Sequence, residues 1–200
     1  MAKRADDGQV HELLLQALET ERGGIQVYTT ALKAAQNDEL KKEWKEYLAE
    51  TRTHEQILLR VFEEVGLDPE TSSAGRKIVA HQGQSLVRAM EMAMETAGGT
   101  AAELVAAECV VLAETKDHQN WELIGKVSER GGPYAKALKT AFEAVEQEED
   151  HHLYHTMGWC RELWIQSLGM PAVLPPPEEI KKVETAIGAS RAQQARDEYL

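Results

Sequence analysis

The chain has 200 residues, of which 42% are hydrophobic and 28% are charged, and its formal net charge is −12. This length fits one domain with a tail and is enough to bury a sizeable core. The acidic balance argues against nucleic acid and anionic membranes as partners, because both select a basic surface. Few phenylalanines, few prolines and few β-branched runs favour helices over strands.

The two cysteines, Cys109 and Cys160, are isolated and occupy apolar helical positions, so we expect reduced core thiols. No apolar run follows the basic pair Lys3-Arg4, so we expect no signal peptide. No apolar run approaches the length of a membrane span. These features predict a cytoplasmic protein.

Apolar residues that recur at helical spacing predict two helices in the first third of the chain. The first spans residues 10–35, and its Gly23-Gly24 pair lets a neighbouring helix approach closely. The second spans residues 38–65 and ends at Gly66.

Three further helices are predicted after a polar loop, over residues 77–96, 101–129 and 134–168. The two outer pairs of helices are joined by short turns, and the long crossover between them carries an extra helix. This order predicts an all-α fold, a four-helix bundle with one long crossover.

The bundle is predicted to occupy residues 9–168, followed by a Pro-rich linker and C-terminal tail over 169–200. The triple proline at 175–177 is expected to act as a stiff spacer. A short helix is predicted over 178–189, and the arm after Pro175 is expected to be dispensable for the fold.

Three of the long helices place a carboxylate and an imidazole one turn apart, on one face. The three pairs are Glu50 with His54, Glu114 with His118, and Glu148 with His152. A carboxylate and an imidazole at this spacing can bind one transition metal. Glu21 adds an acid to the apolar stripe of the first helix, where burial without a partner costs several kcal/mol. A metal would satisfy Glu21, as would a buried base or a position at the bundle rim.

Alternatives remain at three of these positions. His54 is either a hydrogen-bonded core residue or, with Glu50 one turn earlier, a metal ligand. In the fourth helix we prefer Glu114 to Glu108, because Glu114 lies about as far from the Gly131-Gly132 turn as Glu21 lies from the Asn37 turn. In the fifth helix either Glu148 or Glu149 can complete the site, and Glu149 also forms a Glu-x-x-His motif.

The spacing therefore predicts a metal centre inside the bundle. Its predicted ligands are Glu21, Glu50, His54, Glu114, Glu148, Glu149 and His152. Carboxylates with a few imidazoles suit Fe or Mn, two ions in this case, whereas structural zinc sites favour cysteine.

Two stretches carry a similarity to a known family: NDELK…YLAETRTHE within residues 37–55 and KALK…VEQE within 136–148. In these stretches the chain resembles the ferritin-like superfamily, most closely its small bacterial stress-associated YciF-like branch. The resemblance covers residues 10–165. It departs from the family pattern at Thr51, where the Glu of a Glu-x-x-His motif would lie, and in the fourth helix, which has no clean Glu-x-x-Glu.

The resemblance implies a protein that binds metal ions and reacts with small oxidants, peroxide or oxygen, in stress defence. We expect a homodimer, and no catalytic residue is predicted. Two alternatives are a non-catalytic bundle that acts in oligomerisation or partner binding, and a manganese-catalase-like enzyme.

Overall fold

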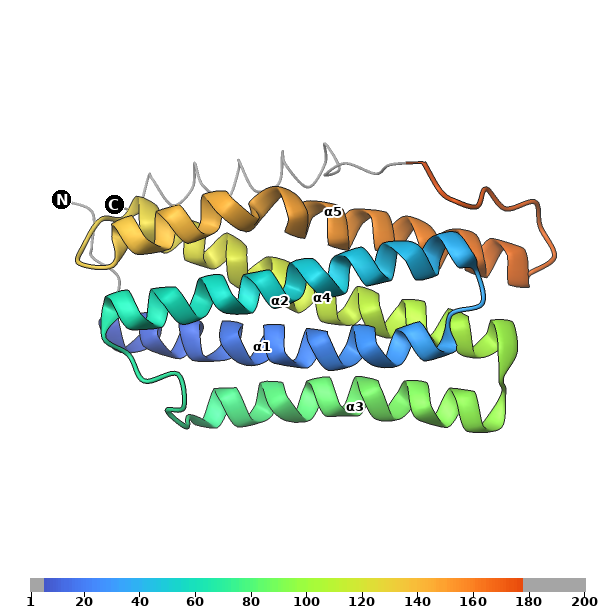
Figure 1. Cartoon of the computed structure of the whole chain (residues 1–200), viewed down its shortest axis with the longest axis horizontal. Helices are drawn as coiled ribbons and strands as arrows, with labels where there is room; N and C mark the ends of the chain where they lie inside the picture. Colours follow the sequence, from blue (N-terminus) through green and yellow to red (C-terminus); the bar gives the residue numbers. More distant parts are fainter. Residues whose placement is uncertain (1–5, 178–200) are drawn as a thin grey trace, which may run out of the picture.

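The computed structural model describes residues 6–177, which form five helices packed in a bundle (Figure 1). The helices are α1 (Asp7–Ala34), α2 (Asp38–Val65), α3 (Ala74–Thr96), α4 (Gly99–Glu129) and α5 (Ala135–Ser167). The prediction of an all-α fold is confirmed, and each helix ends within three residues of its predicted limit. The short helix predicted over 178–189 lies outside the described residues. Within residues 6–177, no helix is long and apolar enough to cross a membrane.

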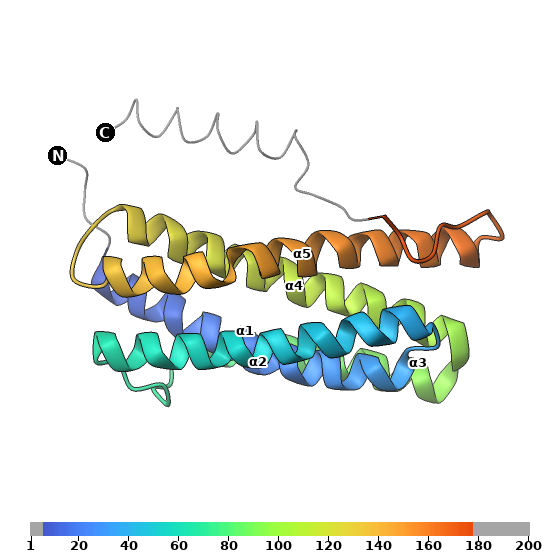
Figure 2. The ribbon, with the colours of Figure 1, turned by 45° about the horizontal axis from the view of Figure 1, so that its top comes forward.

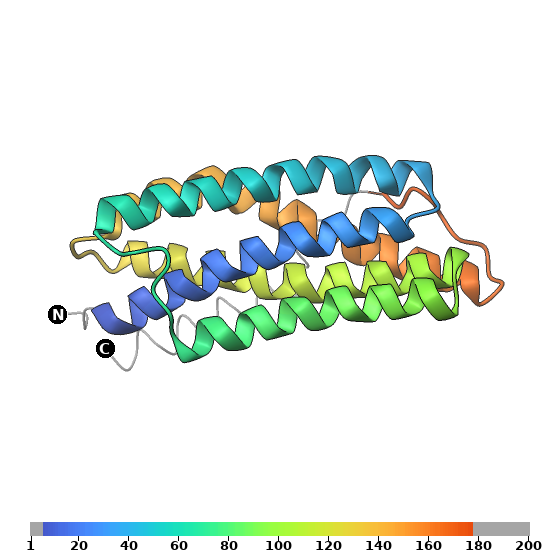
Figure 3. The ribbon, with the colours of Figure 1, turned by 60° about the horizontal axis from the view of Figure 1, so that its bottom comes forward.

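Helix α3, which lies in the connection between α2 and α4, packs on one side of the other four helices (Figures 1 and 3). It contacts α1 and α4 but, within the described part of the chain, neither α2 nor α5. The interior between α1, α2, α4 and α5 is therefore enclosed by four helices.

The turn between α1 and α2 is fixed by side chains at both of its ends. The Asn37 side chain accepts hydrogen bonds from the backbone of Glu39 and Leu40, at 3.0 and 3.2 Å, and so caps α2. The buried carboxylate of Glu103, on α4, accepts two more from the backbone nitrogens of Gln36 and Asn37, both at 2.6 Å. Glu103 thus ties this turn to α4.

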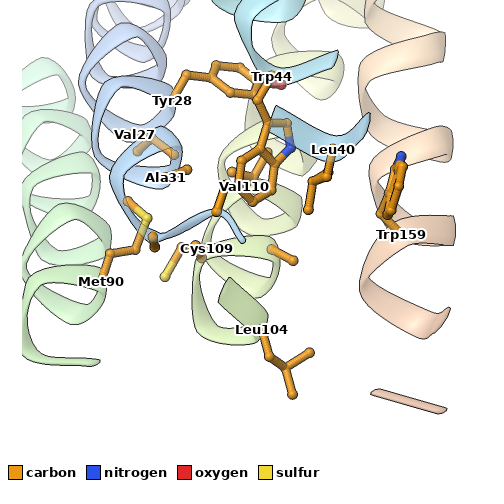
Figure 4. Close-up of a cluster of buried hydrophobic side chains, with 14 of the residues drawn as sticks. Val27, Tyr28, Ala31, Leu40, Trp44, Met90, Leu104, Cys109, Val110 and Trp159 are labelled. Atoms are coloured by element: carbon orange, nitrogen blue, oxygen red, sulfur yellow. The ribbon is translucent and has the colours of Figure 1, made fainter. Parts of the chain in front are cut away.

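The apolar core consists of two clusters, one at each end of the bundle. One lies near the α1–α2 turn and includes Tyr28, Trp44 and Trp159 (Figure 4). The other lies near the α4–α5 turn and includes Phe62 and Trp121. The polar residues of the candidate site lie between the two clusters along the helices, so apolar packing on both sides holds the site in place.

Residues after α5 turn back along it (Figure 2). The Val173 backbone donates a hydrogen bond to Glu162 at 2.9 Å, and His155 Nε2 lies 3.2 Å from the carbonyl of the buried Pro176. The middle residue of the triple proline, Pro176, is therefore packed against α5. The division of the chain at residue 168 stays a prediction.

We expect the Glu103→Ala substitution to destabilise the protein, because two backbone N–H groups lose a carboxylate acceptor. Loss of such bonds costs about 2 kcal/mol, or roughly 4–8 °C in melting temperature at this chain length. Thermal denaturation followed by circular dichroism measures the shift. The matched control is Glu143→Ala, at an exposed ion pair with Lys139 at 3.6 Å, which should change little. Equal shifts in both variants would contradict this role of Glu103.

Comparison of two truncations tests the contact between the tail and the bundle. A chain ending at Leu168 should melt several degrees below one ending at Pro177, because it loses the Val173–Glu162 and Pro176–His155 bonds. Both chains lack residues 178–200, so the difference reports on residues 169–177 alone. Equal melting temperatures would show that the tail adds no stability.

Candidate metal centre

Six ionisable side chains from four helices converge in the middle of the bundle. Each is at most 3% exposed. They are Glu21 of α1, His54 of α2, Glu114 and Asp117 of α4, and Glu149 and His152 of α5.

Helical spacing places two of these groups on each of α4 and α5. Glu114 and Asp117 are three residues apart, as are Glu149 and His152, so each pair shares one helix face. On α1 and α2, by contrast, the residue three positions from the buried ionisable group is small and uncharged. Gly24 lies three residues after Glu21 and Thr51 lies three before His54, and a Cβ on Gly24 would be 3.3 Å from Thr51 Cγ2.

The two histidines are held by a reciprocal exchange between α2 and α5. His54 Nε2 lies 2.7 Å from the carboxylate of Glu148, and His152 Nε2 lies 2.7 Å from that of Glu50. An ionised carboxylate only accepts hydrogen bonds, so each Nε2 carries the proton. In a neutral imidazole the lone pair is then on Nδ1.

Both Nδ1 atoms point into the cluster of acids. His54 Nδ1 lies 3.0 Å from Glu149 Oε1 and 3.8 Å from Glu21 Oε1. His152 Nδ1 lies 3.6 Å from Glu114 Oε2 and 3.8 Å from Glu149 Oε1. The two ring centroids are 5.7 Å apart, so the histidines of α2 and α5 share one site.

Most of the buried polar atoms that have no hydrogen-bond partner among the described residues belong to this cluster. They are Glu21 Oε2, Tyr28 Oη, His54 Nδ1, Glu114 Oε2, Asp117 Oδ1, Glu149 Oε2 and His152 Nδ1. Buried polar atoms are nearly always paired, and a cation coordinated by these atoms would satisfy them together. The other oxygen of Glu21 is satisfied, because Trp121 Nε1 donates to it at 2.8 Å.

Burial and mutual repulsion raise the pKa of three acids. Burial raises the pKa of Glu21 most, followed by the charges of Asp117 and Glu149. Burial also raises the pKa of Asp117, with Glu149 and Glu114 adding to it, and burial and Glu114 raise that of Glu149. Without a cation, these carboxylates hold protons well above their ordinary pKa.

The two imidazoles respond differently to the same interior. Burial lowers the pKa of His54. Burial also opposes the charged form of His152, but the carboxylates of Glu114 and Glu50 outweigh it and raise the pKa of His152 to about 10. A metal that binds His152 Nδ1 must therefore displace a proton at neutral pH.

The structure distinguishes the alternatives left open by the sequence, although the role of every residue as a ligand stays a prediction. Glu149 points inward, whereas Glu148 lies outside, on His54. Glu50 likewise lies outside, on His152. Glu114 is in the cluster, and Glu108 instead accepts a hydrogen bond from Trp164 at 2.9 Å.

Sequence reasoning missed Asp117. It paired Glu114 with His118, but His118 Nε2 lies 2.6 Å from Asp150 and its ring faces Tyr154. The available signal was Glu114-x-x-Asp117, which has the same spacing as Glu149-x-x-His152.

Two groups of three side chains could hold a metal ion. His54, Glu149 and His152 form one, and Glu21, Asp117 and Glu149 form the other. In each group, one ligand atom per residue lies within 4.8 Å of the others. Glu149 belongs to both groups, so it would contribute to holding an ion in either one.

Comparison with known proteins adds no family to this description: no family model, curated protein or solved structure matches the chain.

We expect Asp117→Asn to stabilise the metal-free protein at neutral pH, because folding then no longer requires Asp117 to take up a proton or to bury a charge beside Glu149 and Glu114. That cost is about 1–3 kcal/mol. Because the pKa of Asp117 is raised in the folded state, the free energy of unfolding falls as pH rises above the ordinary pKa of 3.8. This decrease with pH should be smaller in the variant. Thermal melts in chelator between pH 5 and 8 measure both effects, with the exposed Glu143→Gln as control. A lower melting temperature for Asp117→Asn would contradict the repulsion.

Proposed function

We propose that this protein binds two ions of iron or manganese in the core of the bundle. The observation that carries the proposal is the convergence of unpaired carboxylate oxygens and imidazole Nδ1 atoms from four helices. Metal coordination would satisfy these atoms together, whereas hydrogen bonds among the described residues leave them unpaired.

The charges in the cluster support two divalent ions. The inward carboxylates are those of Glu21, Glu114, Asp117 and Glu149, and together they carry four negative charges when ionised. Two divalent cations balance this charge and leave both histidines neutral. The group of His54, Glu149 and His152, with Glu114 beside it, would hold one ion. The group of Glu21, Asp117 and Glu149 would hold the other ion.

The donor set favours iron or manganese. Carboxylates with imidazoles suit these ions, whereas thiolates mark structural zinc and iron–sulfur sites. Cys109 and Cys160 belong to or pack against the apolar cluster near the α1–α2 turn. Burial raises the pKa of both thiols to about 11, so they are not thiolates at neutral pH.

The outer carboxylates would act as positioning residues. Glu50 and Glu148 accept the Nε2–H bonds of the histidines and so aim Nδ1 inward. Histidine ligands of metals characteristically donate their other N–H to a carboxylate. The side chains of Glu50 and Glu148 are 37% and 45% exposed, so the α2–α5 face is where the polar cluster approaches solvent.

We further propose a ferritin-like architecture and a reaction with peroxide or oxygen. The helix pairs α1/α2 and α4/α5, joined through α3, and the acids and histidines between them support this assignment. The stress-defence reaction comes from the sequence resemblance. When bound, the ions would supply electrons to the oxidant, while the apolar clusters on either side limit the access of bulk water.

Metal reconstitution tests the proposal. Chelator-treated protein, supplied with Fe²⁺ or Mn²⁺ without oxygen, should bind two ions per chain and melt at a higher temperature. Free metal at 100 times its dissociation constant adds about 2.7 kcal/mol. His54→Ala combined with His152→Ala should abolish the gain, whereas the exposed His81→Ala should retain it. Anomalous scattering at the iron and manganese edges then identifies the ions.

Failure of either ion to bind or to raise the melting temperature would overturn the metal site and leave a non-catalytic bundle. If the Mn form evolves oxygen from peroxide, the reaction is of the manganese-catalase type. If the Fe form consumes peroxide without evolving oxygen, the reaction is a peroxidase-like reduction.

Metal binding should also become stronger with pH and release protons. His152, with a pKa of about 10, and the acids with raised pKa values hold protons that a metal must displace. The metal-dependent rise in melting temperature should therefore grow between pH 6 and 8. Calorimetry in buffers with different ionisation enthalpies should detect release of about one proton or more per chain at pH 7. Binding that is independent of pH would contradict the use of His152 as a ligand.

A further inference from the structure

A cavity lies outside the candidate metal centre, between α1, α3 and α4, which run side by side (Figure 3). Its volume is about 390 Å³, which lies within the range of small-molecule pockets. Gly23 and Gly83 allow α1 and α3 to approach closely here, since a Cβ on Gly83 would lie 3.4 Å from the Gly23 Cα. These two glycines also line the cavity, and at their positions the wall is backbone alone.

The cavity has a polar end and an apolar end. At the polar end, Asn120 links α4 to α1: Lys116 Nζ donates to its side-chain oxygen, and its amide donates to Thr20 at 2.9 Å. At the apolar end, the wall is formed by Val27 and Leu112. Val27 lies two turns along α1 from Thr20, and Leu112 lies one turn along α4 from Lys116.

Lys116 supplies a positive charge at the polar end. No ion pair among residues 6–177 includes Lys116, although the protein is acidic overall. The other charged residue at this end, Glu19, is bound by Arg76 at 2.8 Å, so its charge is already compensated. Asp117, the neighbour of Lys116 in sequence, points to the other side of α4, into the metal centre.

An exposed apolar side chain belongs to the same wall. Leu112 is 60% exposed, and Leu86 of α3 also lines the cavity. An apolar chain in the cavity would cover such a surface, and an ammonium without a carboxylate partner would bind an anionic head group.

We propose that this cavity binds a small amphipathic carboxylate, with its head group at Lys116 and its aliphatic chain along Val27, Leu86 and Leu112. A carboxylate fits better than an alcohol or an amine, because Lys116 offers hydrogen-bond donors and a positive charge. This site uses none of the candidate metal ligands, and it holds or fails independently of the metal centre.

Calorimetric titration of the full chain with decanoate, below its micelle concentration, tests the proposal. Decanoate should bind one site per chain, and Lys116→Met should weaken it at least tenfold, the loss expected for a charge-assisted hydrogen bond. Lys116→Arg should stay within a few-fold of wild type. The matched control is Lys126→Met, an exposed lysine 3.6 Å from Glu129, which should bind as wild type does.

The ligand series supplies a test that needs no variant. On the wild-type chain, decanoate should bind at least tenfold more tightly than decanol, and decylammonium should bind more weakly still. Absence of saturable decanoate binding, or equal affinity for decanoate and decanol, would overturn the proposal. Val79→Trp, which fills the cavity from α3, should block decanoate binding in protein with or without metal.

Discussion

The constraint on which this structure depends is the burial of four carboxylates beside two imidazoles. Each of these groups is almost inaccessible to water, and within residues 6–177 the buried residues include no lysine or arginine. Carboxylates buried in this way destabilise a fold unless they hold protons or bind a cation. Burial accordingly raises the pKa of Glu21, Asp117 and Glu149. Two apolar clusters with large buried aromatic residues offset that cost from both ends of the bundle. A fold that retains such a cluster sacrifices stability, which is the usual mark of a functional site.

Much of this arrangement could be predicted from the sequence. The apolar periodicity located all five helices, because each is long and bounded by glycine, proline or a capping residue. Glu21, His54 and His152 could be placed inward because each interrupts an apolar stripe. Neighbouring residues were harder to separate, because successive side chains on a helix differ by only about 100°. A small rotation of α4 decides between Asp117 and His118, and packing against α1 and α5 sets that rotation.

Nothing in the sequence of residues 169–177 predicted that this segment contacts α5. A triple proline predicts a stiff, extended segment, and the backbone from 169 to 177 is indeed free of helix. Whether such a segment packs on the bundle depends on partners elsewhere in the chain. Here His155 faces the carbonyl of Pro176, and Glu162 accepts from the backbone of Val173. Both partners lie on α5 and show no pattern in sequence that distinguishes them from ordinary polar positions.

The distribution of charge between the two helix pairs has a mechanical consequence. The α4/α5 pair carries three of the inward acids and His152, whereas the α1/α2 pair contributes only Glu21 and His54. Gly24 and Thr51, three residues from Glu21 and His54, carry no ionisable side chain. Each candidate group of three combines one residue from the α1/α2 pair with two from the α4/α5 pair. Neither helix pair alone therefore contains a complete group, and any ion that occupies one joins the two pairs.

Because such an ion binds only the assembled bundle, its binding free energy adds to the free energy that holds the pairs together. The reciprocal bonds of Glu50 and Glu148 cross the same α2–α5 boundary and hold the imidazoles ready for it.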